Sequence, residues 1–168
     1  MPSPSASAGN PHAGVLNVLK PPGMTSHDVV DHLRHLTGQR RIGHTGTLDP
    51  GACGVLVLCL GGATRIAEFL TERRKGYRAE LTFGMATDSG DAYGAVIRED
   101  DASGLDASTV AEALARFVGS IDQVPPMVSA VHHAGRRLYE RARRGETVEV
   151  APRRVEITEC RMLEFAPG

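Results

Sequence analysis

The sequence predicts a single domain of the α+β class, because strand-like and helix-like patterns follow one another along 168 residues. Apolar runs at 15–19 and 55–60 have the length of short strands. Between them, apolar residues three and four apart predict a helix with one buried face. Apolar and polar residues alternate over 77–83, which is typical of a half-buried strand. A chain of this length can bury one core.

The first half begins with residues 1–13, which are rich in Ser, Pro and Ala and should form a disordered leader. The folded domain is then expected over 14–168, starting with a strand at 15–19. Ser26 is a plausible N-cap for the following helix, and Gly38 ends it. After the strand at 55–60, a short helix is expected over 63–70. Its inward residues would be Ile66, Phe69 and Leu70.

The second half begins with the alternating strand at 77–83, followed by a polar loop over 84–94. A helix should then carry Val110, Leu114 and Phe117 on one face. A strand or loop runs through 124–126, and 135–144 is expected to be helical. Val155 and Ile157 start a last strand.

Composition excludes several classes of protein. No apolar run reaches the roughly eighteen residues of a membrane span, and the start lacks a signal-peptide pattern, so we expect a soluble, cytoplasmic protein. Cys53, Cys59 and Cys160 form no CxxC pair, which argues against a zinc site and for three reduced thiols. The net charge of −1 does not by itself suggest a nucleic-acid partner.

Charge is nevertheless unevenly distributed. Residues 132–154 contain seven arginines against three glutamates, whereas 82–108 contain five aspartates, one glutamate and one arginine. A basic run of this kind is often only a solvated helix face, so it indicates a phosphate-binding surface only with support from other residues.

One loop combines a single carboxylate with unusual backbone freedom. Residues 43–54 include four glycines, and Asp49 is followed by Pro50, which fixes the chain beside it. Asp-Pro-Gly is also a common turn sequence, so Asp49 alone could serve only the turn. A nucleotide-binding phosphate loop is a weaker alternative, because GxxxxGK[ST] is absent and 44–54 contain no lysine.

The loop resembles the aspartate loop of the TruB-type tRNA pseudouridine synthases, and further motifs occur in that family's order. They are Lys20-Pro21-Pro22-Gly23-Met24-Thr25-Ser26, Lys75-Gly76-Tyr77-Arg78-Ala79, the acidic loop 84–94, and the segments 123–130 and 135–143. The resemblance covers about residues 14–157.

The resemblance implies isomerisation of uridine to pseudouridine in the tRNA T-loop, at position 55 in tRNA numbering. It implies no metal, no cofactor, a tRNA T-arm stem-loop as partner, and a monomer. The implied fold is a mixed, largely antiparallel sheet flanked by helices. Residues 14–168 would form the N-terminal part of the catalytic domain, incomplete at the C-terminus.

The resemblance also implies roles for individual residues. Asp49 would be the nucleophile or proton-abstracting base, Tyr77 would stack on the flipped uracil, and His44 would take its place in the T-loop. Lys20 would support the aspartate loop. Thr87 and Asp91 match a polar loop near the substrate. The candidates for RNA backbone contacts are Arg136, Arg137, Arg141, Arg143 and Arg144.

One departure from the family pattern affects function. The chain contains no equivalent of the family's Cys-Ser-x-Gly-Thr-Tyr-Ile-Arg segment, whose arginine pairs with the catalytic aspartate. Such an arginine keeps a carboxylate ionised and oriented. The sequence therefore leaves two readings open: an isomerase that acts through Asp49, or a non-catalytic module that binds or folds tRNA.

Overall fold

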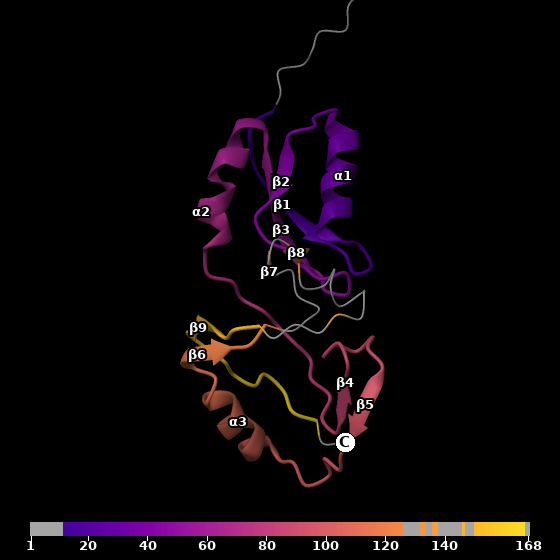
Figure 1. Ribbon diagram of the computed structural model, residues 1–168, viewed down its shortest axis with the longest axis vertical. Helices are drawn as coiled ribbons and strands as arrows, with labels where there is room; N and C mark the ends of the chain where they lie inside the picture. The colour runs from indigo at the N-terminus through magenta and orange to yellow at the C-terminus, as the bar shows by residue number, and fades with distance from the viewer. Residues whose placement is uncertain (1–11, 126–131, 134–135, 138–145, 147–149, 167–168) are drawn as a thin grey trace, which may run out of the picture. The chain divides into compact units, whose positions relative to one another are not determined.

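The computed structural model describes residues 12–125, 132–133, 136–137, 146 and 150–166 (Figure 1). The chain divides into two compact units, Met1–Tyr77 and Arg78–Gly168. Residues 1–11 of the expected leader lie outside the described part, so the leader and the single domain over 14–168 stay predictions.

The first unit is built on a three-stranded antiparallel sheet. Strands β1 (Gly14–Lys20), β2 (Ile42–His44) and β3 (Gly54–Leu60) are arranged in the order β1-β3-β2. The expected strands at 15–19 and 55–60 are confirmed. In Figure 1 the strands lie between α1 (Ser26–Thr37) and α2 (Ala67–Thr71).

The core of this unit forms between α1 and the sheet. Val29 and Val30 of α1 pack in one buried cluster with four residues of β2 and β3: Ile42, Leu56, Leu58 and Leu60. Burial of these side chains supplies the hydrophobic driving force that holds the helix against the strands. The sheet is therefore fixed on the face that α1 covers.

The N-cap of α1 differs from the expectation. Thr25 is the N-cap, because its hydroxyl accepts a hydrogen bond from the Asp28 amide while the Asp28 carboxylate accepts one from the Thr25 amide. The prediction of Ser26 was wrong by one residue, since this reciprocal pairing requires the acid three residues after the cap. The expected end at Gly38 is confirmed, with a left-handed φ of 65°.

The stretch after β3 is wound differently from the expected helix at 63–70. It forms a 3-10 helix, η1 (Gly61–Ile66), before α2. Residues that share a face at 3.6 residues per turn do not share it at three per turn. The prediction that Ile66 and Phe69 point inward was wrong, since both are exposed, while Leu70 is half-buried.

Among its described residues, the second unit contains three antiparallel pairs and one helix. Strand β4 (Met85–Thr87) pairs with β5 (Val96–Glu99), β6 (Gly119–Gln123) with β9 (Arg153–Ile157), and β7 (His132–His133) with β8 (Arg136–Arg137). Helix α3 (Ala107–Ala115) is capped by Asp106. Every strand pair between described residues is antiparallel, so the predicted antiparallel α+β class is confirmed.

Several expectations for this unit were wrong. The alternating stretch 77–83 is not a strand, and Tyr77, Leu81 and Phe83 are exposed. Alternating apolar and polar residues form a strand only when a neighbouring strand bonds their backbone and another element covers their apolar face. Part of the expected loop 84–94 is strand β4 instead. Arg136 and Arg137 are in a strand, not the helix expected over 135–144; the remaining residues of that stretch lie outside the described ones.

Two further elements agree with the sequence. The expected helix around Val110 and Leu114 is α3, although Phe117 follows its end and is exposed. The last strand, at Val155 and Ile157, is β9. No helix in the described ranges has the length and apolar character needed to cross a membrane.

Candidate active site

The loop that carries Asp49 connects two neighbouring strands of the first unit. It leaves β2 after His44 and enters β3 at Gly54. The Thr45 amide donates to the Val57 carbonyl at 3.0 Å, and the Ala52 amide donates to the Asp49 carbonyl at 3.0 Å. The second bond closes a four-residue turn over 49–52, with Pro50 where a fixed φ is favoured.

The residues on both sides of Asp49 are held by the end of β1 and by the segment that follows it. On one side, the Gly23 amide donates to the Pro50 carbonyl at 2.7 Å, and Lys20 Nζ lies 3.3 Å from the same oxygen. On the other side, the Ser26 hydroxyl bonds both the amide and the carbonyl of Leu48. The backbone around Asp49 is therefore fixed by contacts from residues far earlier in the chain.

Lys20 is the most unusual of these residues, because its side chain is fully buried. Its ammonium donates to the carbonyl of Met24 at 2.6 Å and of Pro21 at 3.0 Å, besides Pro50. A buried ammonium is costly unless it is hydrogen-bonded, and three carbonyl oxygens provide that compensation. The lysine thereby joins the end of β1 to the turn that carries Asp49.

The Asp49 side chain itself is exposed. Across the described ranges, no hydrogen bond or ion pair engages its carboxylate. The structure thus combines a restrained backbone with a carboxylate open to solvent. Such a group can accept a proton or attack an electrophile that is placed beside it.

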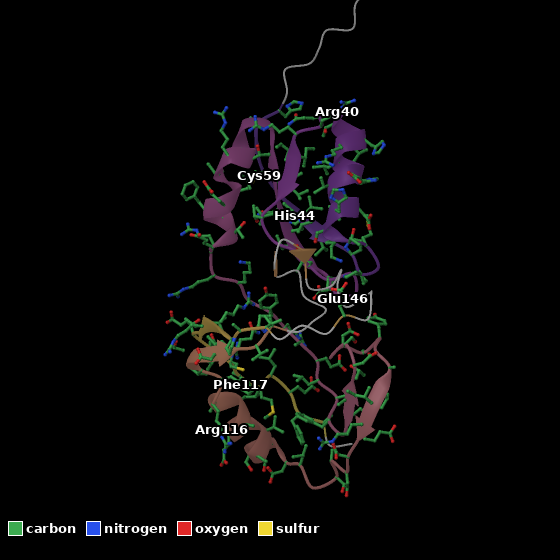
Figure 2. The ribbon with its side chains drawn as sticks, viewed as in Figure 1. Arg40, His44, Cys59, Arg116, Phe117 and Glu146 are labelled. Carbon is green, nitrogen blue, oxygen red and sulfur yellow. The ribbon has the colours of Figure 1, made fainter. Side chains whose placement is uncertain are left out.

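His44 and Tyr77 differ in how firmly they are placed. His44 ends β2 opposite Leu58 and is half-buried, at the end of the sheet from which the Asp49 loop leaves (Figure 2). Tyr77 belongs to no strand and is 78% exposed. An exposed tyrosine ring is free to stack on a base, but its sequence-based placement at a strand start was wrong.

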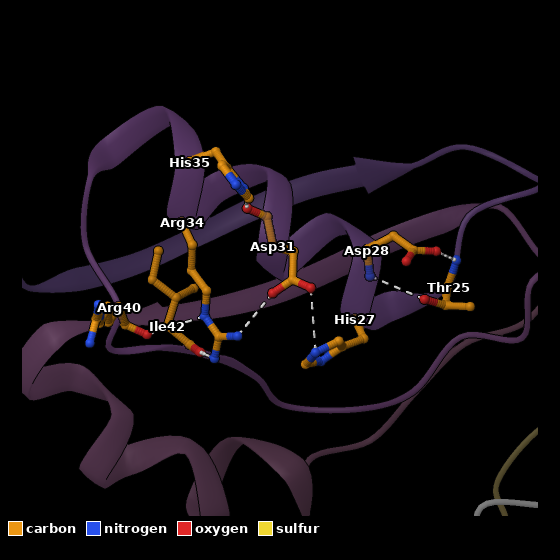
Figure 3. Close-up of polar contacts among 8 residues, drawn as sticks. All are labelled: Thr25, His27, Asp28, Asp31, Arg34, His35, Arg40 and Ile42. Carbon is orange, nitrogen blue, oxygen red and sulfur yellow. Dashed lines mark hydrogen bonds and ion pairs between the residues drawn. The ribbon is translucent and has the colours of Figure 1, made fainter.

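Helix α1 is tied to the start of β2 by Arg34 (Figure 3). Its guanidinium donates to the carbonyl of Arg40 at 3.1 Å and of Ile42 at 3.1 Å, and it contacts the Asp31 carboxylate at 2.9 Å. The planar fork suits several acceptors at once. These contacts of Arg34 fix β2, which ends at His44, relative to α1, whose first residue contacts Leu48.

Thr87 and Asp91 organise a turn in the second unit. The Thr87 hydroxyl donates to the Asp91 carbonyl at 2.8 Å, while the Asp91 carboxylate accepts from the Ser89 hydroxyl at 2.8 Å and the Tyr93 amide at 2.9 Å. The Ser89 hydroxyl, and then the Tyr93 amide, lower the pKa of Asp91. Thr87 also pairs with Val96 of β5, while the described hydrogen bonds of the Asp91 side chain stay within its own loop.

The arginine candidates are described only in part. Arg136 and Arg137 lie in β8, opposite His133 and His132. Arg141, Arg143 and Arg144 are outside the described residues. In the ranges that are described, no group of three acidic, histidine or cysteine side chains could hold a metal ion. All three cysteines are free thiols, as expected.

Sequence reasoning missed the two residues that complete the support of the loop. Gly23 acts through its backbone amide, which no residue pattern reveals. Ser26 was assigned to a cap, although Thr25 and Asp28, three residues apart, carry the capping signal. Had Thr25 been chosen as the cap on this signal, the Ser26 hydroxyl would have remained available for a contact elsewhere.

The family model for the N-terminal domain of TruB family pseudouridylate synthases matches residues 34–168. A tRNA pseudouridine synthase B of Symbiobacterium thermophilum is 59% identical over 155 residues, which are 92% of this chain and 52% of the relative. One from Pelotomaculum thermopropionicum is 54% identical, covering 92% of this chain and 48% of the relative.

The chain thus spans about half the length of the curated relatives it matches. A chain in a crystal structure of a Cbf5–Nop10–Gar1 complex is 30% identical and covers 71% of this chain and 31% of that chain, with a TM-score of 0.47.

Proposed function

The chain belongs to the TruB family of pseudouridylate synthases, and from this premise we propose that it isomerises a T-loop uridine of tRNA through Asp49. The observation that carries the proposal is that the backbone on both sides of Asp49 is restrained while its carboxylate is exposed. Leu48 and Pro50 are held by Ser26, Gly23 and Lys20, while the carboxylate faces solvent. A restrained carboxylate open to a substrate suits a reaction that depends on placement.

The proposed reaction moves one bond. The bond from uracil N1 to the ribose carbon C1′ breaks, the base turns, and C5 of the ring forms a new bond to C1′. C5 then loses its proton, and the freed ring nitrogen N1 gains one. Reactant and product are isomers, so the step needs neither an oxidant nor a reductant. Asp49 serves either as the nucleophile or as the base that removes a proton, and both roles require its ionised form.

The target base must leave the T-loop before the carboxylate can reach it. Unstacking costs a few kcal/mol, which stacking on a protein ring and filling of the vacated space offset. We assign the stacking role to the exposed Tyr77 and the filling role to His44 beside the loop. Support of the loop falls to Lys20. Substrate contacts are assigned to Thr87 and Asp91.

The proposed partner is the T-arm stem-loop, bound by a monomer in the cytoplasm. Arginines 136, 137, 141, 143 and 144 are assigned to its phosphates. Phosphate contacts raise affinity without reading sequence, so this binding should weaken steeply with salt.

A second candidate function is a tRNA-binding or tRNA-folding module without turnover. It is favoured by the absence, within the described residues, of a cation paired with the Asp49 carboxylate. The module predicts salt-dependent T-arm binding that is unchanged in Asp49→Asn, with no pseudouridine formed.

The two functions are separated by tritium release from a T-arm stem-loop labelled at uridine C5. The chain is assayed alone and also as a hybrid, the joined protein, in which it replaces the matching half of the Symbiobacterium thermophilum relative. The hybrid ensures that the half length of the chain does not limit the result. The isomerase predicts release in the joined protein and its loss in Asp49→Asn. Asp122→Asn, at an exposed position of β6 in the second unit, is the control. Binding without release, in both forms, would replace the isomerase by the binding module.

A further inference from the structure

Ser26 is the first residue of α1, yet its side chain takes no part in the helix cap. The residue is 3% exposed, and its hydroxyl contacts the Asp49 loop. Ser26 Oγ accepts a hydrogen bond from the Leu48 amide at 2.9 Å and donates one to the Leu48 carbonyl at 3.2 Å. One hydroxyl thus satisfies both backbone groups of the residue before Asp49.

Leu48 is held by its side chain as well. Its isobutyl group packs against the core formed by α1 and the sheet, and it lies near Gly54 at the start of β3. The two contacts act on different parts of the same residue. Side-chain packing fixes where Leu48 lies, and the paired hydrogen bonds fix the orientation of its peptide groups, from which the chain continues to Asp49.

We propose that Ser26 is a positioning residue for Asp49, acting through Leu48, an inference that rests on the proposed isomerase. At Leu48 the 45–53 loop is no longer paired with β3, so no neighbouring strand in the described part of the chain bonds the Leu48 backbone. The Ser26 hydroxyl provides these hydrogen bonds instead. Without it, the Leu48 peptide groups rotate more freely and the Asp49 carboxylate samples more directions. A misplacement of about 1 Å can lower turnover by up to 100-fold.

The competing explanation is that Ser26 only stabilises α1. Thr25 provides the matched control, because it is the adjacent residue and its hydroxyl caps the same helix without touching Leu48. Thr25→Ala removes a helix contact and leaves the loop contact in place. Ser26→Ala removes the loop contact and leaves the cap.

Amide hydrogen exchange tests the contact in the chain itself. Ser26→Ala should make the Leu48 amide exchange roughly tenfold faster or more, as expected when its hydrogen bond is lost. Thr25→Ala should leave that amide slow. Equal protection of Leu48 in the parent and in Ser26→Ala would overturn the proposal, whatever the enzyme assay shows.

Kinetics test the consequence in the joined protein described above. Ser26→Ala should lower kcat about tenfold or more with little change in KM, because Ser26 reaches the reacting atoms only through Asp49. Thr25→Ala should keep the parent kcat at a temperature where both variants are folded. Ser26→Cys, which keeps the volume but bonds weakly, repeats the test if the alanine variant does not fold.

The two possible failures are distinguishable. If the parent joined protein releases tritium and Ser26→Ala has the kcat of Thr25→Ala, the positioning role is overturned and the isomerase stands. If the parent releases none, the proposed function fails first, and the Leu48 exchange result still decides whether Ser26 restrains the loop.

Discussion

The ammonium nitrogen of Lys20 lies 3.3 Å from the carbonyl oxygen of Pro50, thirty residues later in the chain. The contact joins the end of β1 to the residue after Asp49. With the Ser26 contacts on Leu48, it restrains the backbone on both sides of the candidate catalytic carboxylate.

Replacing Lys20 by methionine should destabilise the first unit. The substitution leaves three carbonyl oxygens without their ammonium partner, so we expect a loss of about 3 kcal/mol in the free energy of unfolding. Urea denaturation measures it. Lys75→Met is the control, since Lys75 also donates to two carbonyls but is exposed, and it should change stability by less than about 0.5 kcal/mol. Equal effects of the two substitutions would contradict the buried role of Lys20.

Arg34→Lys should loosen the attachment of α1 to β2. Lysine keeps the charge but loses the planar fork that reaches the carbonyls of Arg40 and Ile42 together. Because the site is partly exposed, we expect a loss of only about 1 kcal/mol in unfolding free energy. Arg65→Lys, at an exposed position of η1, is the control in the same urea titration. Unchanged stability in Arg34→Lys would show that the fork contributes nothing.

The cap of α3 should respond to acid. Hydrogen bonds from the Thr109 amide, and then the Ser108 hydroxyl, lower the pKa of Asp106 from 3.8 to about 2. A lowered folded-state pKa means that the ionised carboxylate stabilises the folded state. This contribution is fully present above about pH 4 and is lost as pH falls toward 2.

Carboxyl NMR of Asp106 measures this titration directly. The stability of α3 should fall over the same pH range in the parent. Asp106→Asn should remove that part of the pH dependence, because an asparagine oxygen caps a helix without titrating. A midpoint for Asp106 near 3.8 would exclude the capped geometry.

Cysteine labelling should report opening of the sheet. Cys59 is buried in β3 between Val15 and Gly43, and burial raises the pKa of its thiol, whereas Cys53 in the Asp49 loop is exposed. The thiolate is the reactive form, so a disulfide reagent at pH 8 should modify Cys53 well before Cys59. In concentrated urea, the two rates should become similar. Native labelling of Cys59 as fast as Cys53 would mean that β3 is not buried as described.

Elements whose pattern is set locally were predicted correctly, whereas elements that depend on partners distant in the sequence were not. Strands β1 and β3 and helix α1 were predicted to within a residue or two. For α1 and β3 the apolar pattern reflects burial in their shared core, whereas the apolar residues of β1 are mostly exposed and this strand is held by its pairing with β3. The stretch 77–83 has an equally regular pattern but is not a strand, since a strand also requires a neighbour that no local pattern specifies.

The candidate site shows the same division. Asp49 could be proposed because glycine, proline and a lone carboxylate lie together in a loop that resembles the aspartate loop of a known family. The residues that orient it could not, since Ser26 bonds Leu48 across 22 positions and Gly23 uses only its backbone amide. Lys20 was identified through the family resemblance, and the structure adds the three carbonyls it contacts.

The central claim is that Asp49 carries the isomerisation of a T-loop uridine, and the most direct measurement is of the product itself. A T-arm stem-loop is incubated with the joined protein and with its Asp49→Asn form, and its nucleosides are separated by chromatography. Pseudouridine should form with the parent and should fall by at least about 1,000-fold in rate with Asp49→Asn, as for loss of a catalytic nucleophile or base. Equal amounts of pseudouridine from the two proteins would contradict the claim.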